Sequence, residues 1–96
     1  MTREEFSDHL SKAALPAELI PELCVLWLDK KGAWDAAHEL AQDLDSPSGA
    51  RLHAYLHRKE GDLGNARYWY RRAGLAQFEG SLVAEWETLL RDFCRS

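Results

Sequence analysis

Apolar residues recur every three or four positions along most of this chain, a spacing that places them on one face of an α-helix. In the last segment, Leu82, Trp86, Leu89 and Phe93 follow this spacing. The β-branched residues that favour strands are scarce, and no segment alternates apolar and polar residues over the length of a strand. We therefore expect an all-α protein of five to six antiparallel helices.

Residues that start and stop helices divide this pattern. Thr2 and Glu5 form a capping-box pair. Pro16 is expected to end the first helix, because the residue before a proline avoids helical geometry. Glycines after the apolar runs, and prolines or serines before them, bound the other segments. The expected helices cover about 2–15, 21–31, 33–44, 46–60, 62–73 and 81–93.

The second of these segments, residues 21–31, is apolar on nearly every side, which indicates a helix buried between neighbours. We expect this helix to lie at the centre of the fold. In the fifth and sixth segments, Leu63 and Val83 belong to the apolar stripes, so they are expected to face inward.

The middle of the chain repeats itself. A shift of 29 residues places Gly61 on Gly32, and each unit then has an apolar helix, a glycine turn and a second helix with a central alanine. Glycine permits the tight turn, and alanine lets the paired helices approach closely. One such hairpin leaves a face uncovered, so we expect two stacked hairpins, with Trp34 and Tyr70 in a shared interior.

Residues of this region also match the positions of a known repeat. They are the turn Gly61-Asp62, the small residues Ala54, Ala66 and Ala73, and the aromatic Tyr70. On these residues, the segment 21–74 resembles the tetratricopeptide-repeat superfamily, and its second unit looks like the Sel-like branch. The resemblance implies stacked helical hairpins that bind proteins. It also implies that the first helix of each repeat lines a groove in which basic residues take acidic or carboxylate-ended peptides.

Composition indicates one ordinary globular domain spanning residues 1–96, with 46% hydrophobic and 29% charged residues. The two cysteines, Cys24 and Cys94, are far apart and form neither a disulfide framework nor a CxxC motif. The first residues lack the basic and apolar regions of a signal peptide, and no apolar run approaches the ~20 residues of a membrane helix. We expect a cytoplasmic protein without a membrane segment.

The net charge of −4 is unevenly distributed. Residues 1–50 carry 4 Lys and Arg against 10 Asp and Glu, whereas residues 51–96 carry 8 against 6. In this basic half, Arg51, Tyr55, Arg58 and Lys59 are close together on the expected fourth helix. Guanidinium groups bind carboxylates in two-pronged geometry, so these four are the candidate partner-binding residues for a protein or acidic peptide. The alternative is that charged faces of neighbouring helices pair with each other.

A second candidate face contains histidines. His53 and His57 are four residues apart and Glu60 follows three later, which places two imidazoles and a carboxylate along one side of a helix. This face is the alternative site, for a small ligand or a metal. Two histidines do not complete a metal site, so His38 or Cys24 would have to contribute. The simpler interpretation packs these histidines against aromatic rings, and we expect no bound metal or cofactor.

Other functions find little support in the sequence. The chain has no nucleophile elbow, glycine-rich phosphate loop or HExxH motif, so we do not expect an enzyme. Net acidity disfavours nucleic-acid binding, although residues 67–72 interleave arginines with aromatic residues. The sequence hypothesis is a non-catalytic protein–protein interaction module. The alternatives are a small-ligand or metal-binding domain and a homo-oligomerising unit.

Overall fold

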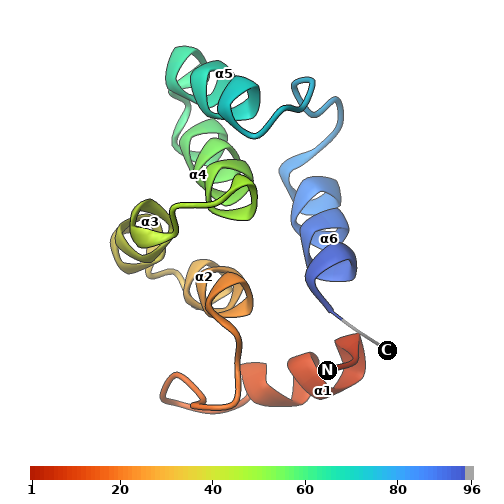
Figure 1. Cartoon of the computed structure of the whole chain (residues 1–96). Coiled ribbons are helices and arrows are strands. Elements are labelled where there is room, and N and C mark those ends of the chain that lie inside the picture. Colours follow the sequence, from red (N-terminus) through yellow and green to blue (C-terminus); the bar gives the residue numbers. More distant parts are fainter. Residues whose placement is uncertain (95–96) are drawn as a thin grey trace.

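The computed structural model describes residues 1–94 and contains six helices in that range (Figure 1). No strand occurs in the same residues, which confirms the expected all-α fold class. No helix within residues 1–94 is long and apolar enough to cross a membrane. The helices are α1 (Arg3–Leu10), α2 (Pro21–Lys30), α3 (Trp34–Asp43), α4 (Pro47–Glu60), α5 (Leu63–Arg72) and α6 (Leu82–Phe93).

Helix α4 is the centre of the fold. It packs against α2, α3, α5 and α6, and nearly all of its residues from Gly49 to His57 are buried. The expectation that residues 21–31 form the central helix is therefore wrong. Helix α2 is buried on most sides, as its composition predicts, but α4 is the longer helix and lies between more neighbours (Figure 1). Apolar content indicates that a helix is buried, but not how many helices surround it.

A glycine turn joins α2 to α3, and another joins α4 to α5. Gly32, between α2 and α3, has a φ of 84°, and Gly61, between α4 and α5, has a φ of 90°. Both values lie in the left-handed region that a side chain rarely adopts. After the second turn, the Asp62 carboxylate accepts a hydrogen bond from the Asn65 backbone N–H at 3.2 Å, which starts α5. These contacts confirm the turns that the sequence predicts.

The core has two parts on different faces of α4. The larger cluster joins α1, α2, α4 and α6 with two alanines of α3, and Trp34 packs against it. The smaller cluster consists of Ala54, Ala66 and Tyr70, between α4 and α5. The expectation that Trp34 and Tyr70 share one interior is therefore wrong, because the two rings pack into different clusters.

Three further expectations from the pattern are wrong. Helix α1 ends at Leu10 instead of continuing to Pro16, and the Ser11 hydroxyl donates back to a carbonyl of the last turn at 2.6 Å. Leu63 and Val83 do not face inward and are 49% and 67% exposed. Each lies in the first turn of its helix, where the apolar stripe begins at the edge of the packed interface.

Close approach of α4 and α5 depends on Ala54 and Ala66, which are both fully buried. We expect Ala54→Leu to lower the free energy of unfolding by about 1–3 kcal/mol, because extra methyl groups have no space in this contact. Urea unfolding followed by tryptophan fluorescence measures the change. Ala84→Leu, at an exposed position of α6, is the matched control and should change stability by less than about 0.5 kcal/mol. Equal effects of the two variants would contradict the close contact.

Candidate functional site

Two buried carboxylates organise the basic residues of α4. The carboxylate of Asp29, which is 3% exposed, accepts hydrogen bonds from the Tyr55 hydroxyl at 2.7 Å and the Lys59 ammonium at 2.8 Å. Burial raises the pKa of the Tyr55 hydroxyl, and the hydrogen bond to Asp29 raises it further, so the phenol stays protonated and donates. Asp29 therefore joins α2 to α4 through one cation and one phenol.

Glu85 of α6 repeats this arrangement with other residues of α4 and α5. Its carboxylate, 2% exposed, accepts a hydrogen bond from Arg58 at 2.7 Å and another from the Tyr70 hydroxyl at 2.5 Å. Arg58 also donates to the Gly80 carbonyl. Burial, followed by the hydrogen bond to Glu85, raises the pKa of Tyr70. One carboxylate thus ties α4, α5 and α6 together.

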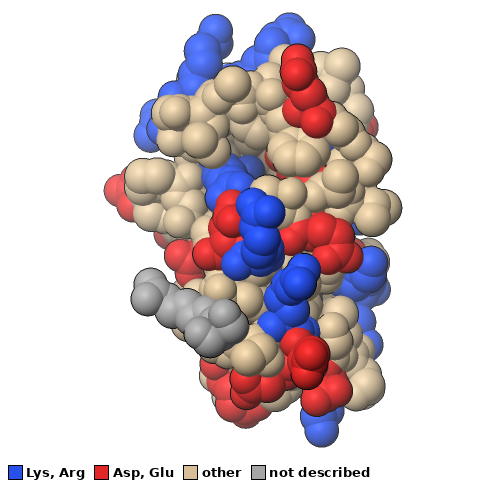
Figure 2. All heavy atoms as spheres, turned by 90° about the vertical axis from the view of Figure 1, so that its right-hand side faces the viewer, with Lys and Arg blue, Asp and Glu red and all other residues tan. Residues whose placement is uncertain are grey.

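The last of the predicted partner-binding residues, Arg51, pairs with Asp92 of α6 at 2.7 Å. All four candidates on α4 therefore make contacts within the chain. Figure 2 shows basic and acidic side chains side by side across the middle of the face that α6 covers in Figure 1. This is the pairing of charged helix faces that the sequence left open as an alternative. Binding of an acidic peptide by these residues stays a prediction, and the peptide would have to displace the internal carboxylates.

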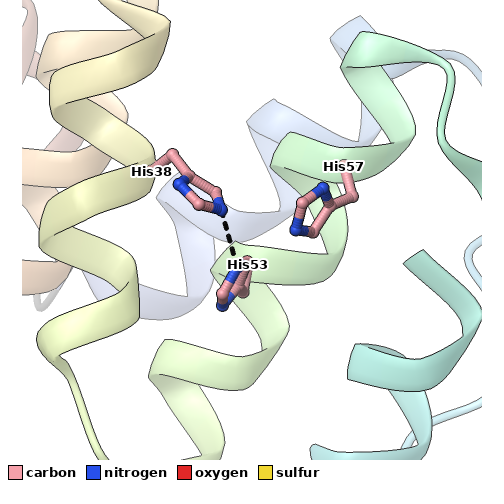
Figure 3. A group of neighbouring side chains, drawn as sticks. All are labelled: His38, His53 and His57. Atoms are coloured by element: carbon pink, nitrogen blue, oxygen red, sulfur yellow. Dashed lines mark hydrogen bonds between the residues drawn. The ribbon is translucent and has the colours of Figure 1, made fainter. Parts of the chain in front are cut away.

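The histidines form a separate cluster between α3 and α4 (Figure 3). His38 Nε2 and His53 Nε2 are 2.8 Å apart and hydrogen-bonded. One ring nitrogen of each of His38, His53 and His57 lies within 4.8 Å of those of the other two. His53 and His57 are buried, and His38 is half-buried. The fold thus supplies the third imidazole that the sequence required for a metal site.

Aromatic packing holds these three rings in place. Trp34, one turn before His38, donates its indole N–H to the Leu56 carbonyl at 2.9 Å and thereby fixes α3 against α4. Its ring stacks on His38 with a centroid separation of 4.9 Å, and Trp69 stacks on His53 at 3.9 Å. The interpretation that the histidines pack against aromatic rings describes these contacts, and the same contacts leave the ring nitrogens turned toward one another.

The electrostatic environment lowers the pKa of two of the three histidines, His53 and His38. Burial, and then the neighbouring His38 and His57, lower the pKa of His53 to about 4. Burial and the nearby His57 also lower the pKa of His38. A neutral imidazole is the form that has a lone pair for a metal ion. These two histidines are therefore in the ligand form without any need for deprotonation at pH 7.

Glu60 lies in a different position from the one that helical spacing predicts. Its carboxylate is 2.6 Å from Nδ1 of His57 and is not one of the three converging groups. This contact favours a proton on Nδ1 and leaves the lone pair on Nε2 of His57. A carboxylate bound to the far nitrogen of a histidine is the usual arrangement behind a metal ligand. Glu60 therefore orients His57.

Cys24, the other residue considered for this site, lies outside the cluster. It is buried in the main core, and its thiol donates to the Leu19 carbonyl. His38 is 15 residues from His53 in sequence and on another helix, so helical periodicity alone did not relate the two. The packing of α3 against α4 brings the two histidine faces together. A signal for this contact would be the stacking of hairpins that the repeat leads us to expect.

We expect Arg58→Met to lower the free energy of unfolding by about 3 kcal/mol, because Glu85 would be left buried without its cation. Adding Glu85→Leu should recover part of this loss, since the unpaired charge is then removed. Urea unfolding measures both. Arg67→Met is the matched control, because Arg67 is exposed on α5 and makes no ion pair among the described residues. Similar stability of Arg58→Met and Arg67→Met would mean that the buried pair is not structural.

No protein-family model, curated protein or solved structure matches this chain. The resemblance to tetratricopeptide repeats therefore stays a prediction. The functional inference has to rest on the geometry of the histidine cluster and on the charges around it.

Proposed function

We propose that this protein binds a divalent transition-metal ion through His38, His53 and His57. The observation that carries the proposal is the convergence of three imidazoles from two helices, two of them buried. Isolated histidines on a surface do not bring their ring nitrogens together in this way. Three histidines with one further position for water or another ligand form a common protein site for zinc.

The distances in the cluster suit such an ion. Two nitrogens bound to one tetrahedral zinc at about 2.0–2.1 Å are about 3.3 Å apart. The hydrogen-bonded pair His38–His53 is slightly closer than this, at 2.8 Å, and all three ring nitrogens lie within 4.8 Å of one another. Binding of an ion would require the rings to rotate from these positions until three nitrogens reach bonding distance.

The ligand types narrow the choice of ion. Imidazole suits Zn²⁺, Co²⁺, Ni²⁺ and Cu²⁺, whereas Mg²⁺ and Ca²⁺ prefer oxygen ligands. The lowered pKa of His53 and of His38 means that protons compete little for these ligands at pH 7. Glu60, behind His57, would strengthen that histidine as a ligand.

We expect tag-free protein to bind one Zn²⁺ or Co²⁺ per chain, as measured by isothermal titration calorimetry at pH 7. His38→Phe, His53→Phe and His57→Phe should each weaken binding strongly, because phenylalanine keeps the ring packing and removes the lone pair. Glu60→Gln should weaken binding by about 10- to 100-fold. His9→Phe is the matched control, since His9 lies on α1 outside the cluster and should leave binding unchanged.

A stoichiometry near zero would contradict this proposal. Equal binding by His9→Phe and His53→Phe would contradict it as well, because the ion would then be held elsewhere. Circular dichroism of each variant shows whether a loss of binding reflects a loss of helix.

A second candidate function is protein–protein interaction, which the exposed basic face of α5 favours. Arg67 and Arg71 are one turn apart, are exposed, and have no carboxylate partner among the described residues. Tyr68 beside them is 43% exposed. In Figure 2, basic side chains project from the upper end of the molecule, where α5 lies in Figure 1. An acidic peptide would find these cations unpaired, in contrast to those of α4.

For this candidate, we expect a fluorescein-labelled glutamate-rich peptide to bind the wild-type protein and to dissociate as salt is added. Arg67→Glu combined with Arg71→Glu should abolish the rise in fluorescence anisotropy. Arg3→Glu combined with Lys12→Glu makes the same charge change at exposed positions outside α5, and binding should persist. If both double variants lose binding equally, net charge governs the interaction and the face on α5 does not.

A further inference from the structure

His53 and His57 differ in what their Nδ1 atoms contact. Nδ1 of His57 is bonded to Glu60, whereas no side chain or backbone group among residues 1–94 bonds to Nδ1 of His53. His9 Nδ1 is the only buried side-chain nitrogen or oxygen in that range without a partner. Nδ1 of His53 is therefore in contact with solvent, although the residue as a whole is only 4% exposed.

A groove between α3, α4 and α5 supplies this contact. Its volume is about 440 Å³, and His53 is among the residues that line it. Trp69, whose ring stacks on His53 at 3.9 Å, lines the same groove, and the Arg72 guanidinium lies 5.5 Å from the Trp69 ring centre. The groove thus has an imidazole, an indole and a guanidinium in sequence along its wall. A volume of this size accommodates a small molecule.

The charged residues of the groove favour a ligand with no more than one negative charge. Arg72 is the only Lys or Arg in the described lining, and its partners there are the rings of Trp69 and Tyr68 and the Tyr68 hydroxyl at 3.3 Å. Asp45 is the only acidic residue in the same lining and would repel a molecule with several negative charges.

We propose that this groove binds a small monocarboxylate, which accepts a hydrogen bond from the Nδ1–H of His53 and is attracted by the charge of Arg72 in the same lining, and that this binding is coupled to occupancy of the metal site. The inference rests on the proposed function. When Nε2 of His53 binds a metal ion, the proton of that imidazole is confined to Nδ1, which then points a donor into the groove. Without the metal, the proton is shared between two tautomers through the bond to His38.

The bound carboxylate would accept a hydrogen bond from Nδ1 of His53, as Glu60 does from Nδ1 of His57. A carboxylate on the far nitrogen makes the imidazole a stronger ligand, and the metal in turn makes the N–H a stronger donor. Coupling between two binding sites is reciprocal, so the carboxylate and the metal each raise the affinity of the other by the same factor. The groove and the histidine cluster would therefore act as one linked site.

The test measures Zn²⁺ affinity with a competing chelator dye, in sodium acetate and in sodium chloride at equal ionic strength. We expect acetate to tighten zinc binding by about fivefold or more. Arg72→Gln should remove this gain. Arg91→Gln, an exposed arginine of α6 outside the groove, is the control and should keep the gain. In nitrogen NMR spectra of the zinc form, the His53 proton should be on Nδ1.

Tight zinc binding without an effect of acetate would overturn this inference and leave the proposed function standing. An equal effect of acetate on Arg72→Gln and the wild type would also overturn it. If acetate strongly changes the visible bands of the Co²⁺ form, the anion binds the metal directly and the proposed position is wrong. Absence of zinc binding would overturn both proposals.

Discussion

Burial of α4 on nearly every side is the constraint on which the other features depend. A helix in this position cannot leave polar groups without partners, because an unpaired polar group in a buried site costs more than its hydrogen bond contributes. Yet α4 carries two histidines, a tyrosine and three basic residues. Neighbouring helices supply partners for all of these residues except His57, which pairs with Glu60 of α4 itself. The pairings hold α2, α3 and α6 against α4.

Two of the resulting clusters have the same composition and are electrically balanced. Asp29 pairs with Lys59 and Tyr55, and Glu85 pairs with Arg58 and Tyr70. In each, one carboxylate meets one cation and one protonated phenol. The third cluster is different, because it consists of imidazoles, and burial lowers the pKa of His53 and of His38. Three converging ring nitrogens distinguish this cluster as the proposed metal site.

Local sequence was sufficient to predict most of the helices, but not which helices pack against one another. The capping pair Thr2–Glu5, the left-handed Gly61 and the Asp62 cap act over a few residues, so spacing alone predicts them. The partners of Arg58 and of His38 depend on how whole helices pack, which no short window contains. Arg58 is 27 residues from Glu85 and thus gave the pattern of an exposed basic face.

The histidine site illustrates the same limit. His53 and His57 share a helix face and were identified from their spacing, with Glu60 beside them. His38 was one of two residues named to complete the site, and only the packing of α3 on α4 decides for it over Cys24. The role of Glu60, behind His57 instead of among the converging groups, depends on side-chain orientation, which spacing does not determine.

X-ray absorption spectroscopy at the zinc edge of the metal-loaded protein tests the central claim most directly. The account predicts three imidazole nitrogens at about 2.0–2.1 Å and one further oxygen ligand. Scattering from fewer than three imidazoles, or from sulfur at about 2.3 Å, would contradict it, because the ion would then be held by other residues than His38, His53 and His57.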